Sequence, residues 1–177
     1  ILDILDKLVI FLYKKATSIV VVTDTFKERI AADGINPDKI HIVKNGVHLY
    51  KFQQQEKDIE LMKKYQLEGK FVIAYIGTHG MAHKLDFILD CAKKVENKNI
   101  HFLFVGAGAM KTRLVRQAKE LNLDNVTMAN AVPKEDVPKH ISLSDVALIP
   151  LTNTDPFKTV WRAKIVDHSA MVHPLRV

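Results

Sequence analysis

The chain has 177 residues, 47% of them hydrophobic, and a formal net charge of +6. This composition is that of a globular chain and excludes a disordered one, and the length suits one domain or one domain and a piece of another. The single cysteine, Cys91, excludes an intrachain disulfide, and no group of cysteines and histidines has the spacing of a zinc site. The 26 lysines and arginines are spread along the chain rather than clustered, so we expect no nucleic-acid partner.

The first residues do not have the pattern of a signal peptide, because no charged segment and no cleavage site flank an apolar core. The apolar run from Leu8 to Tyr13 is far shorter than the ~20 residues that cross a bilayer. Because the chain begins with Ile1 and not with methionine, we expect it to be a piece of a longer protein.

The first 46 residues predict two helices and two short strands. Apolar residues at helical spacing and β-branched runs place the helices at 1–15 and 26–32 and the strands at 18–22 and 40–43. Asp24 or Thr25 is expected to cap the second helix, and Gly34 to end it.

From residue 51 onward the chain predicts a regular α/β pattern. Segment 51–58 is polar and rich in glutamine, which favours a linker, and a helix at 59–66 follows it. Apolar runs then alternate with amphipathic segments, which predicts strands at 70–76, 100–105, 125–128 and 146–149 and helices at 83–95, 109–121 and 134–143. Such alternation is typical of a Rossmann-like parallel sheet with helices on both faces.

The loop after the first strand of this sheet is the most informative motif. Ligands of parallel sheets bind at the carboxyl ends of the strands. Strand 70–76 stops at Gly77, Gly80 follows, and a helix begins soon after, which presents backbone amides and a helix N-terminus to a phosphate. Thr78 can add a hydroxyl and Lys84 a positive charge, although a solvated first-turn lysine explains Lys84 equally well.

A second glycine turn, Gly106 to Gly108, follows the next strand. The third glycine of the dinucleotide fingerprint would fall at Lys111, and residues 130–131 lack the acidic group that should end the following strand. The sequence also lacks the Gly-Lys-Ser/Thr of a Walker A loop. These absences disfavour a nicotinamide-dependent enzyme and leave a simple tight turn as the alternative for Gly106 and Gly108.

Five segments share their order and spacing with one known family. They are the NGV turn at 42–47, the glycine loop at 74–77 with Lys84, the glycine turn at 102–108, the pair 124–127 and 132–133, and SDVALIP at 144–150. Together they cover residues 16–150, and through them the chain resembles the GT-B glycosyltransferases of family 4, the glycosyl transferases group 1.

The resemblance implies a two-domain enzyme that retains anomeric configuration and needs no metal or other cofactor. Its C-terminal domain would hold the substrate, a nucleotide-diphosphate sugar. Residues 1–50 would be the end of the acceptor domain and the interdomain turn, 51–69 a linker and helix, and 70–177 a donor-binding domain that is incomplete at its C-terminal end. The expected partners are a sugar or lipid-linked acceptor and the cytoplasmic face of the membrane, and the expected role is surface-polysaccharide, lipopolysaccharide or O-antigen synthesis.

The same resemblance assigns the binding residues. Those expected at the donor phosphates are Gly77, Thr78, Gly80, Lys84, Lys158 and Thr159. Those expected at the nucleotide are Gly106, Gly108, Val132 and Asp167. Asp167 stands where the family has a ribose-binding glutamate, and Thr159 where it has another glutamate. The chain also departs from the family at His48, Thr78 and Leu85, where aspartate, arginine and glycine are common.

We therefore predict part of a retaining glycosyltransferase. The chain alone should bind a nucleoside diphosphate weakly and transfer nothing, because transfer needs both sides of the cleft. Two alternatives stay open at this point. One is a sugar-nucleotide epimerase or dehydrogenase on a Rossmann sheet, and the other is a non-catalytic nucleotide-binding scaffold.

Overall fold

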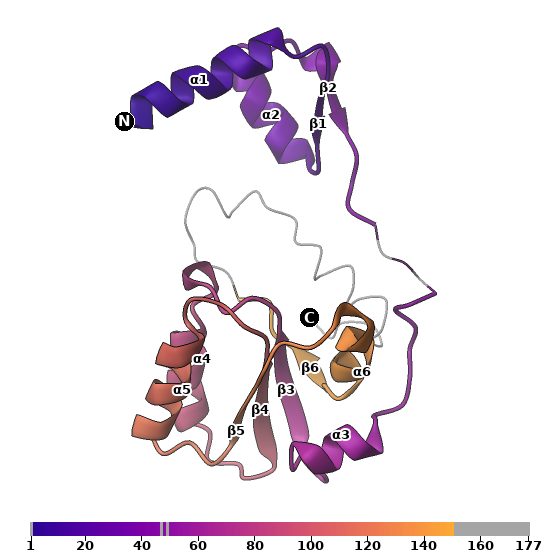
Figure 1. The fold of residues 1–177 in the computed structure, drawn as a ribbon, viewed down its shortest axis with the longest axis vertical. Helices are drawn as coiled ribbons and strands as arrows, with labels where there is room; N and C mark the ends of the chain where they lie inside the picture. Colours follow the sequence, from indigo (N-terminus) through magenta and orange to yellow (C-terminus); the bar gives the residue numbers. More distant parts are fainter. Residues whose placement is uncertain (1, 47, 49, 151–177) are drawn as a thin grey trace. The chain divides into compact units, whose positions relative to one another are not determined.

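The computed structural model describes residues 2–46, 48 and 50–150 of the chain (Figure 1). These residues form two compact units, one that ends at Gly46 and one that begins after it. Each unit is built around its own small parallel sheet.

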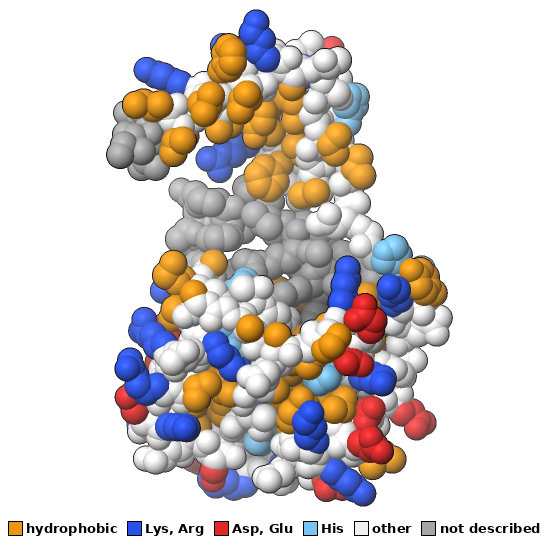
Figure 2. Space-filling model, viewed as in Figure 1, with side chains coloured by type: hydrophobic (Ala, Val, Ile, Leu, Met, Phe, Trp, Pro, Cys, Tyr) orange, Lys and Arg blue, Asp and Glu red, His pale blue; other side chains and the backbone are white. Residues whose placement is uncertain are grey.

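The first unit contains α1 (Leu2–Lys15), β1 (Ile19–Val21), α2 (Asp24–Ala32), a short 3₁₀ helix and β2 (Ile40–Ile42). The two strands are parallel, and their apolar residues form a small core with α2 that consists of Ile19, Val21, Ile30, Ile35 and Ile40. The predicted elements are thus confirmed. Figure 2 shows hydrophobic side chains along α1, where Ile4, Leu5, Leu8, Val9, Phe11 and Leu12 are exposed.

The predicted cap of α2 was wrong by one or two residues. Thr23 has an extended backbone (φ −142°, ψ 155°), and its hydroxyl oxygen accepts a hydrogen bond from the Phe26 amide at 3.2 Å. Asp24 and Thr25 already lie inside the helix, so their side chains are not at the capping position. Gly34 follows the helix with a positive φ of 81°, as predicted for the residue that ends it.

The second unit is a four-stranded parallel sheet in the order β5-β4-β3-β6. Its strands are β3 (Phe71–Ile76), β4 (Ile100–Val105), β5 (Val126–Ala129) and β6 (Val146–Ala147). Its helices are α3 (Ile59–Lys64), α4 (Leu85–Lys93), α5 (Lys111–Glu120) and α6 (Val137–Ser142). This arrangement confirms the predicted α/β fold class.

Alternate residues of the strands face opposite sides of this sheet, as the twofold side-chain period of a strand requires. On β3, Val72, Ala74 and Ile76 pack into one core with Ile141 of α6 and Leu67, which follows α3. Tyr75, Phe102 and Phe104 pack into the other core with Leu85 and Leu89 of α4 and Leu114 of α5. Figure 1 shows α4 and α5 on one side of the sheet and α3 and α6 on the other, which explains why the strands are apolar throughout.

The helices α4, α5 and α6 begin later than the sequence pattern indicated, and a 3₁₀ helix precedes two of them. Residues Met81–His83 form a 3₁₀ helix, and α4 starts only at Leu85, because Lys84 has a left-handed backbone (φ 46°, ψ 41°) that interrupts a helix. A 3₁₀ helix likewise precedes α6, where Pro138 lies in the first turn and cannot donate a backbone hydrogen bond.

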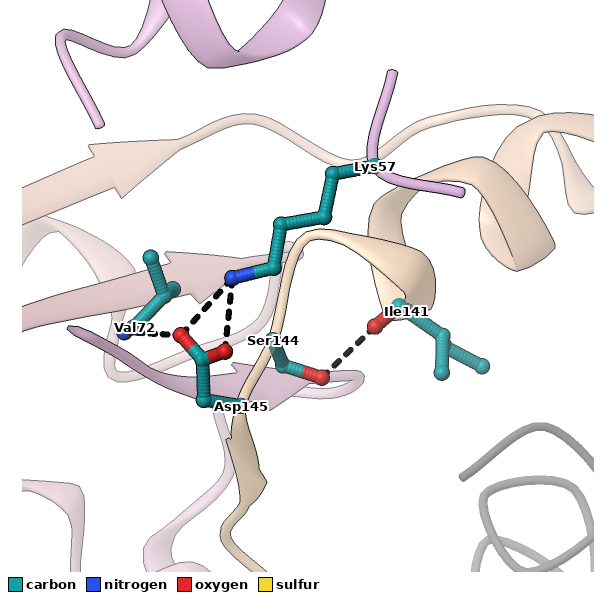
Figure 3. Close-up of polar contacts among 5 residues, drawn as sticks. All are labelled: Lys57, Val72, Ile141, Ser144 and Asp145. Carbon is teal, nitrogen blue, oxygen red and sulfur yellow. Dashed lines mark hydrogen bonds and ion pairs between the residues drawn. The ribbon is translucent and has the colours of Figure 1, made fainter. Parts of the chain in front are cut away.

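The segment that precedes α3 packs against the rest of the second unit. Phe52 is buried in the core beside α3 and α6. Lys57 forms an ion pair with Asp145 at 2.7 Å, and the same carboxylate accepts the Val72 amide at 2.7 Å (Figure 3). Asp145 therefore joins this segment, β3 and the start of β6.

Candidate functional site

The candidate site lies at the carboxyl ends of β3, β4 and β5, where the first two strands continue into glycine loops. The Gly77 amide donates to the Val105 carbonyl at 2.8 Å, and the His79 amide donates to the Ala107 carbonyl at 2.8 Å. The Met110 amide donates back to the His79 carbonyl at 2.9 Å. The two loops thus extend the pairing of β3 with β4 beyond the strands and hold each other through backbone groups.

Two positions in the second loop require glycine because the loops approach so closely. Both Gly106 and Gly108 have a φ of +152°. A Cβ on Gly106 would lie 1.9 Å from the Gly77 carbonyl oxygen, and one on Gly108 would lie 2.6 Å from the His79 carbonyl oxygen. A simple tight turn is therefore an incomplete account of this pair, since each glycine also makes room for the first loop.

A pocket of about 260 Å³ opens at this edge of the sheet. It brings together four of the residues that the sequence assigned to the donor, namely Gly77, Thr78, Gly106 and Val132. Its other lining residues are Ile76, Val105, Ala107, Ala131 and Val137. The pocket thus has an apolar wall, from β5 to α6, that faces backbone groups of the glycine loops.

Gly80 and Lys84 line a different pocket, of about 210 Å³, at the start of α4 and α5. Gly80 has an ordinary φ of −104°, and a Cβ there would meet nothing closer than 3.6 Å, so the fold does not require glycine at this position. Arg113 lines the same pocket and lies 3.9 Å from the Asp86 carboxylate. The predicted donor-phosphate residues are therefore divided between two neighbouring pockets.

Three further predicted residues, Lys158, Thr159 and Asp167, lie outside the described part of the chain. Their assignment to the donor remains a prediction.

The first glycine loop lies beside three aromatic rings, of which those of Tyr75 and His79 are buried. The Tyr75 hydroxyl donates to the Thr78 carbonyl at 2.7 Å, which fixes the loop to the end of β3. The Tyr75 ring also packs against the rings of His79 and His83, with centroids 5.8 and 5.7 Å apart. Nothing in the sequence indicated this role for Tyr75, because an aromatic residue in an apolar strand is ordinary core.

Lys111 is another residue whose place was not predicted. It is the first residue of α5, and its ammonium group donates a hydrogen bond to the Ala129 carbonyl at the end of β5. Burial lowers the pKa of this lysine below its usual value. The only signal in the sequence was that Lys111 replaces the third glycine of the dinucleotide fingerprint, a position where the helix passes close to the sheet.

Among residues 2–46, 48 and 50–150, no three His, Cys, Asp or Glu side chains are placed to hold a metal ion together. Within the same residues, no helix has the length and apolar character that crossing a bilayer requires.

Comparison with known proteins connects this chain to one enzyme family. Residues 42–160 match the family described as glycosyl transferases group 1. A curated relative, the putative teichuronic acid biosynthesis glycosyltransferase TuaH of Bacillus subtilis (strain 168), is 27% identical over 140 residues. That match covers 78% of this chain and 34% of TuaH.

Solved structures show the same fold. Anabaena Alr3699/HepE, crystallised with UDP and glucose, aligns with a TM-score of 0.77 and 15% identity over 93% of this chain and 45% of its own. S. aureus TarM, in a mutant form crystallised with fondaparinux, alpha-GlcNAc-glycerol and UDP, aligns with a TM-score of 0.63 and 15% identity over 80% of this chain and 27% of its own. The chain thus spans about a third of the curated relative and less than half of these two structures.

Proposed function

The chain belongs to the glycosyl transferases group 1 family, and on that premise we propose that it is the donor-binding part of a retaining glycosyltransferase. The enzyme would transfer a sugar from a nucleotide-diphosphate sugar to a sugar or lipid-linked acceptor during surface-polysaccharide synthesis, at the cytoplasmic face of the membrane. The names of TuaH and of the UDP complexes of HepE and TarM support this assignment.

The observation that carries the proposal is the pair of glycine loops at the carboxyl edge of the sheet. They are bonded to each other, and they line a pocket together with Val132. Loop amides other than those of Gly77, His79 and Gly106, which hold the loops in place, and the exposed Thr78 hydroxyl would donate hydrogen bonds to a diphosphate, and the apolar wall that includes Val132 suits a nucleoside.

The chemistry asked of these residues is electrostatic. When the glycosidic bond to the donor phosphate breaks, negative charge develops on the departing diphosphate. Preorganised amides and the cations Lys84 and Lys158 would stabilise that charge without a metal ion. We propose that Asp167 contacts the ribose and that Thr159 binds near the phosphates.

Catalysis itself would also need the acceptor domain, which forms the other side of the cleft in a two-domain transferase. In a two-domain transferase the acceptor is held opposite the donor, and transfer depends on that alignment. We therefore propose that this chain binds a nucleoside diphosphate and does not transfer sugar by itself.

Calorimetric titration of the chain with UDP, GDP and NAD tests the proposal. We expect UDP or GDP to bind and NAD not to bind. Thr78→Val and Lys84→Ala should each weaken the binding of UDP or GDP by about tenfold, since each removes a hydrogen bond to a charged group. Lys98→Ala, at the opposite edge of the sheet, is the matched control and should bind normally.

The variants also distinguish the two pockets, since Thr78 lines one and Lys84 the other. A selective effect of Thr78→Val would locate the diphosphate at the paired glycine loops. Binding of NAD in place of UDP and GDP would instead indicate an epimerase or dehydrogenase. Binding that neither substitution changes would contradict the proposed site and favour a scaffold.

A further inference from the structure

We propose that Lys111 is a positioning residue, which holds the end of β5 against the second glycine loop and thereby sets the wall of the donor pocket. The inference rests on the proposed function, because the pocket that it concerns is the proposed nucleotide site. Lys111 itself has no assigned role in the sequence motifs.

Lys111 is tied to both structures that it would join. Its backbone amide donates to the Gly108 carbonyl at 3.0 Å, at the end of the second glycine loop. Its side chain reaches across to the Ala129 carbonyl, the last residue of β5. One residue thus connects the loop after β4 with the end of the neighbouring strand.

The Ala129 carbonyl is a shared acceptor. It receives the Gly106 amide at 3.4 Å in addition to the Lys111 ammonium group. Ala129 is buried, and the chain passes directly from it through Asn130 to Ala131 and Val132, which line the pocket. The direction in which this segment leaves the sheet therefore depends on how the Ala129 carbonyl is held.

The position of Lys111 is electrostatically adverse for a lysine. It occupies the first turn of α5, where the partial positive charge of the helix N-terminus disfavours another cation. Burial also lowers its pKa, so the surroundings further disfavour the charged form. A solvated lysine would avoid the cost of burial, which argues that the hydrogen bond to Ala129 accounts for this placement.

This placement also explains the missing glycine of the dinucleotide fingerprint. In that motif the third glycine allows the helix to pack closely against the strand. Here the side chain of Lys111 spans the space between helix and strand instead, and its ammonium group makes the connection. The Gly106–Gly108 turn is therefore held at the edge of the sheet although the third glycine of the dinucleotide fingerprint is missing.

Two substitutions separate this role from general stability. Lys111→Met keeps the length and apolar stem of the side chain but removes the donor, whereas Lys111→Arg keeps a charged donor. We expect Lys111→Met to weaken UDP binding by about tenfold and Lys111→Arg to recover most of the affinity, with a change in melting temperature of less than about 3 °C in both. Lys119→Met, an exposed position on the same helix, should match the wild-type chain.

Amide hydrogen exchange without nucleotide provides an independent readout. In Lys111→Met the amides of residues 130–132 should exchange faster, while those of β3 should not change. If the unsubstituted chain fails to bind UDP but this local effect is present, the proposed function fails and the positioning role stands. If Lys111→Met binds UDP normally, or exchanges normally at residues 130–132, the positioning role is wrong.

Discussion

The two edges of the larger sheet are held together by different kinds of interaction. At the carboxyl edge, backbone hydrogen bonds join the loops that contain Gly77 and Gly106, and glycine allows their close approach. Side chains of Tyr75 and Lys111 add hydrogen bonds to backbone carbonyls there. At the amino edge, pairs of side chains add to backbone bonds such as that of the Phe71 amide with the Asn99 carbonyl. The side-chain contacts include Asp145 with Lys57 and Val72, Lys98 with Asp124, and His101 with Thr127.

This difference indicates how the domain separates stability from binding. A loop held by its own backbone leaves side chains such as Thr78 and Lys84 exposed to solvent and able to meet a ligand. The ligand of the proposed site does not contact the amino edge, so charged side chains there can form ion pairs with each other. Substitutions of exposed side chains at the carboxyl edge should therefore alter binding, whereas substitutions that break a close or buried contact at either edge should alter stability.

The largest effect is expected from Gly106→Ala. The new methyl group would meet the Gly77 carbonyl oxygen at 1.9 Å, on a backbone whose φ of +152° already disfavours a side chain. Overpacking and backbone strain together should cost about 3 kcal/mol or more of the free energy of unfolding. Urea denaturation measures this loss, and UDP binding should be abolished with it.

Gly80→Ala is the matched control for that substitution. It lies in the other glycine loop, has an ordinary φ, and offers 3.6 Å to the nearest atom. Its free energy of unfolding should change by less than about 0.5 kcal/mol. If both substitutions lowered the free energy of unfolding equally, the close backbone contact at Gly106 would not explain why glycine is needed there.

Asp145→Ala should give the next largest effect. It leaves the buried Val72 amide without its carboxylate acceptor and removes the partner of Lys57. We expect a loss of about 1–3 kcal/mol in the free energy of unfolding, mainly from the unsatisfied amide, and urea denaturation measures it.

Lys57→Met isolates the ion pair, because Asp145 can still accept the Val72 amide. The two side chains are 35% and 28% exposed, so the pair should contribute only about 0.2–1 kcal/mol. A loss as large as that of Asp145→Ala would mean that the ion pair, and not the amide contact, holds this edge.

His101 should make the amino edge sensitive to acid. Burial lowers the pKa of His101, the nearby charge of Lys70 lowers it further, and Asp124 partly opposes both. The unfolded chain therefore binds the proton more readily, so His101 favours the folded state above its ordinary pKa of about 6.5 and this contribution is lost as the pH falls below that value. His101→Gln, which retains a hydrogen-bonding group for Thr127, should reduce the loss of stability between pH 7.5 and 5.5. An unchanged pH dependence would show that another group is responsible.

Local patterns in the sequence predicted most of this fold, and these errors lie at the starts of helices. Strand 100–105 was predicted with its observed bounds because six apolar-rich residues end at a glycine. The start of α4 was missed because nothing in the sequence marks the left-handed backbone of Lys84. Thr23, in turn, was passed over because several consecutive residues are all competent caps.

The candidate site was predictable to a similar extent. The glycines of both loops were predicted as site residues because predicted strands end there. The reason why Gly106 and Gly108 are needed lies in the backbone of residues 77–79, far away in sequence. Lys111 could be noticed only as a missing glycine, since its partner Ala129 belongs to the next strand. Sequence patterns locate such loops, but the contacts between them emerge only on folding.

The smallest effect concerns the exposed ion pair of Lys98 and Asp124. The hydrogen bond and charge of Lys98 lower the pKa of Asp124, so the pair adds stability above the ordinary pKa of the carboxyl group and loses it as the pH falls through the lowered value. Because both side chains are more than two thirds exposed, salt should screen the pair almost completely. Asp124→Asn should therefore change stability little, but it also removes the charge that raises the pKa of His101. The NMR titration midpoint of His101 should move to lower pH in this variant, and the shift should shrink in 1 M salt. A midpoint that stays in place would contradict the coupling of Asp124 with His101, whereas a shift that salt reduces would show that their charges interact.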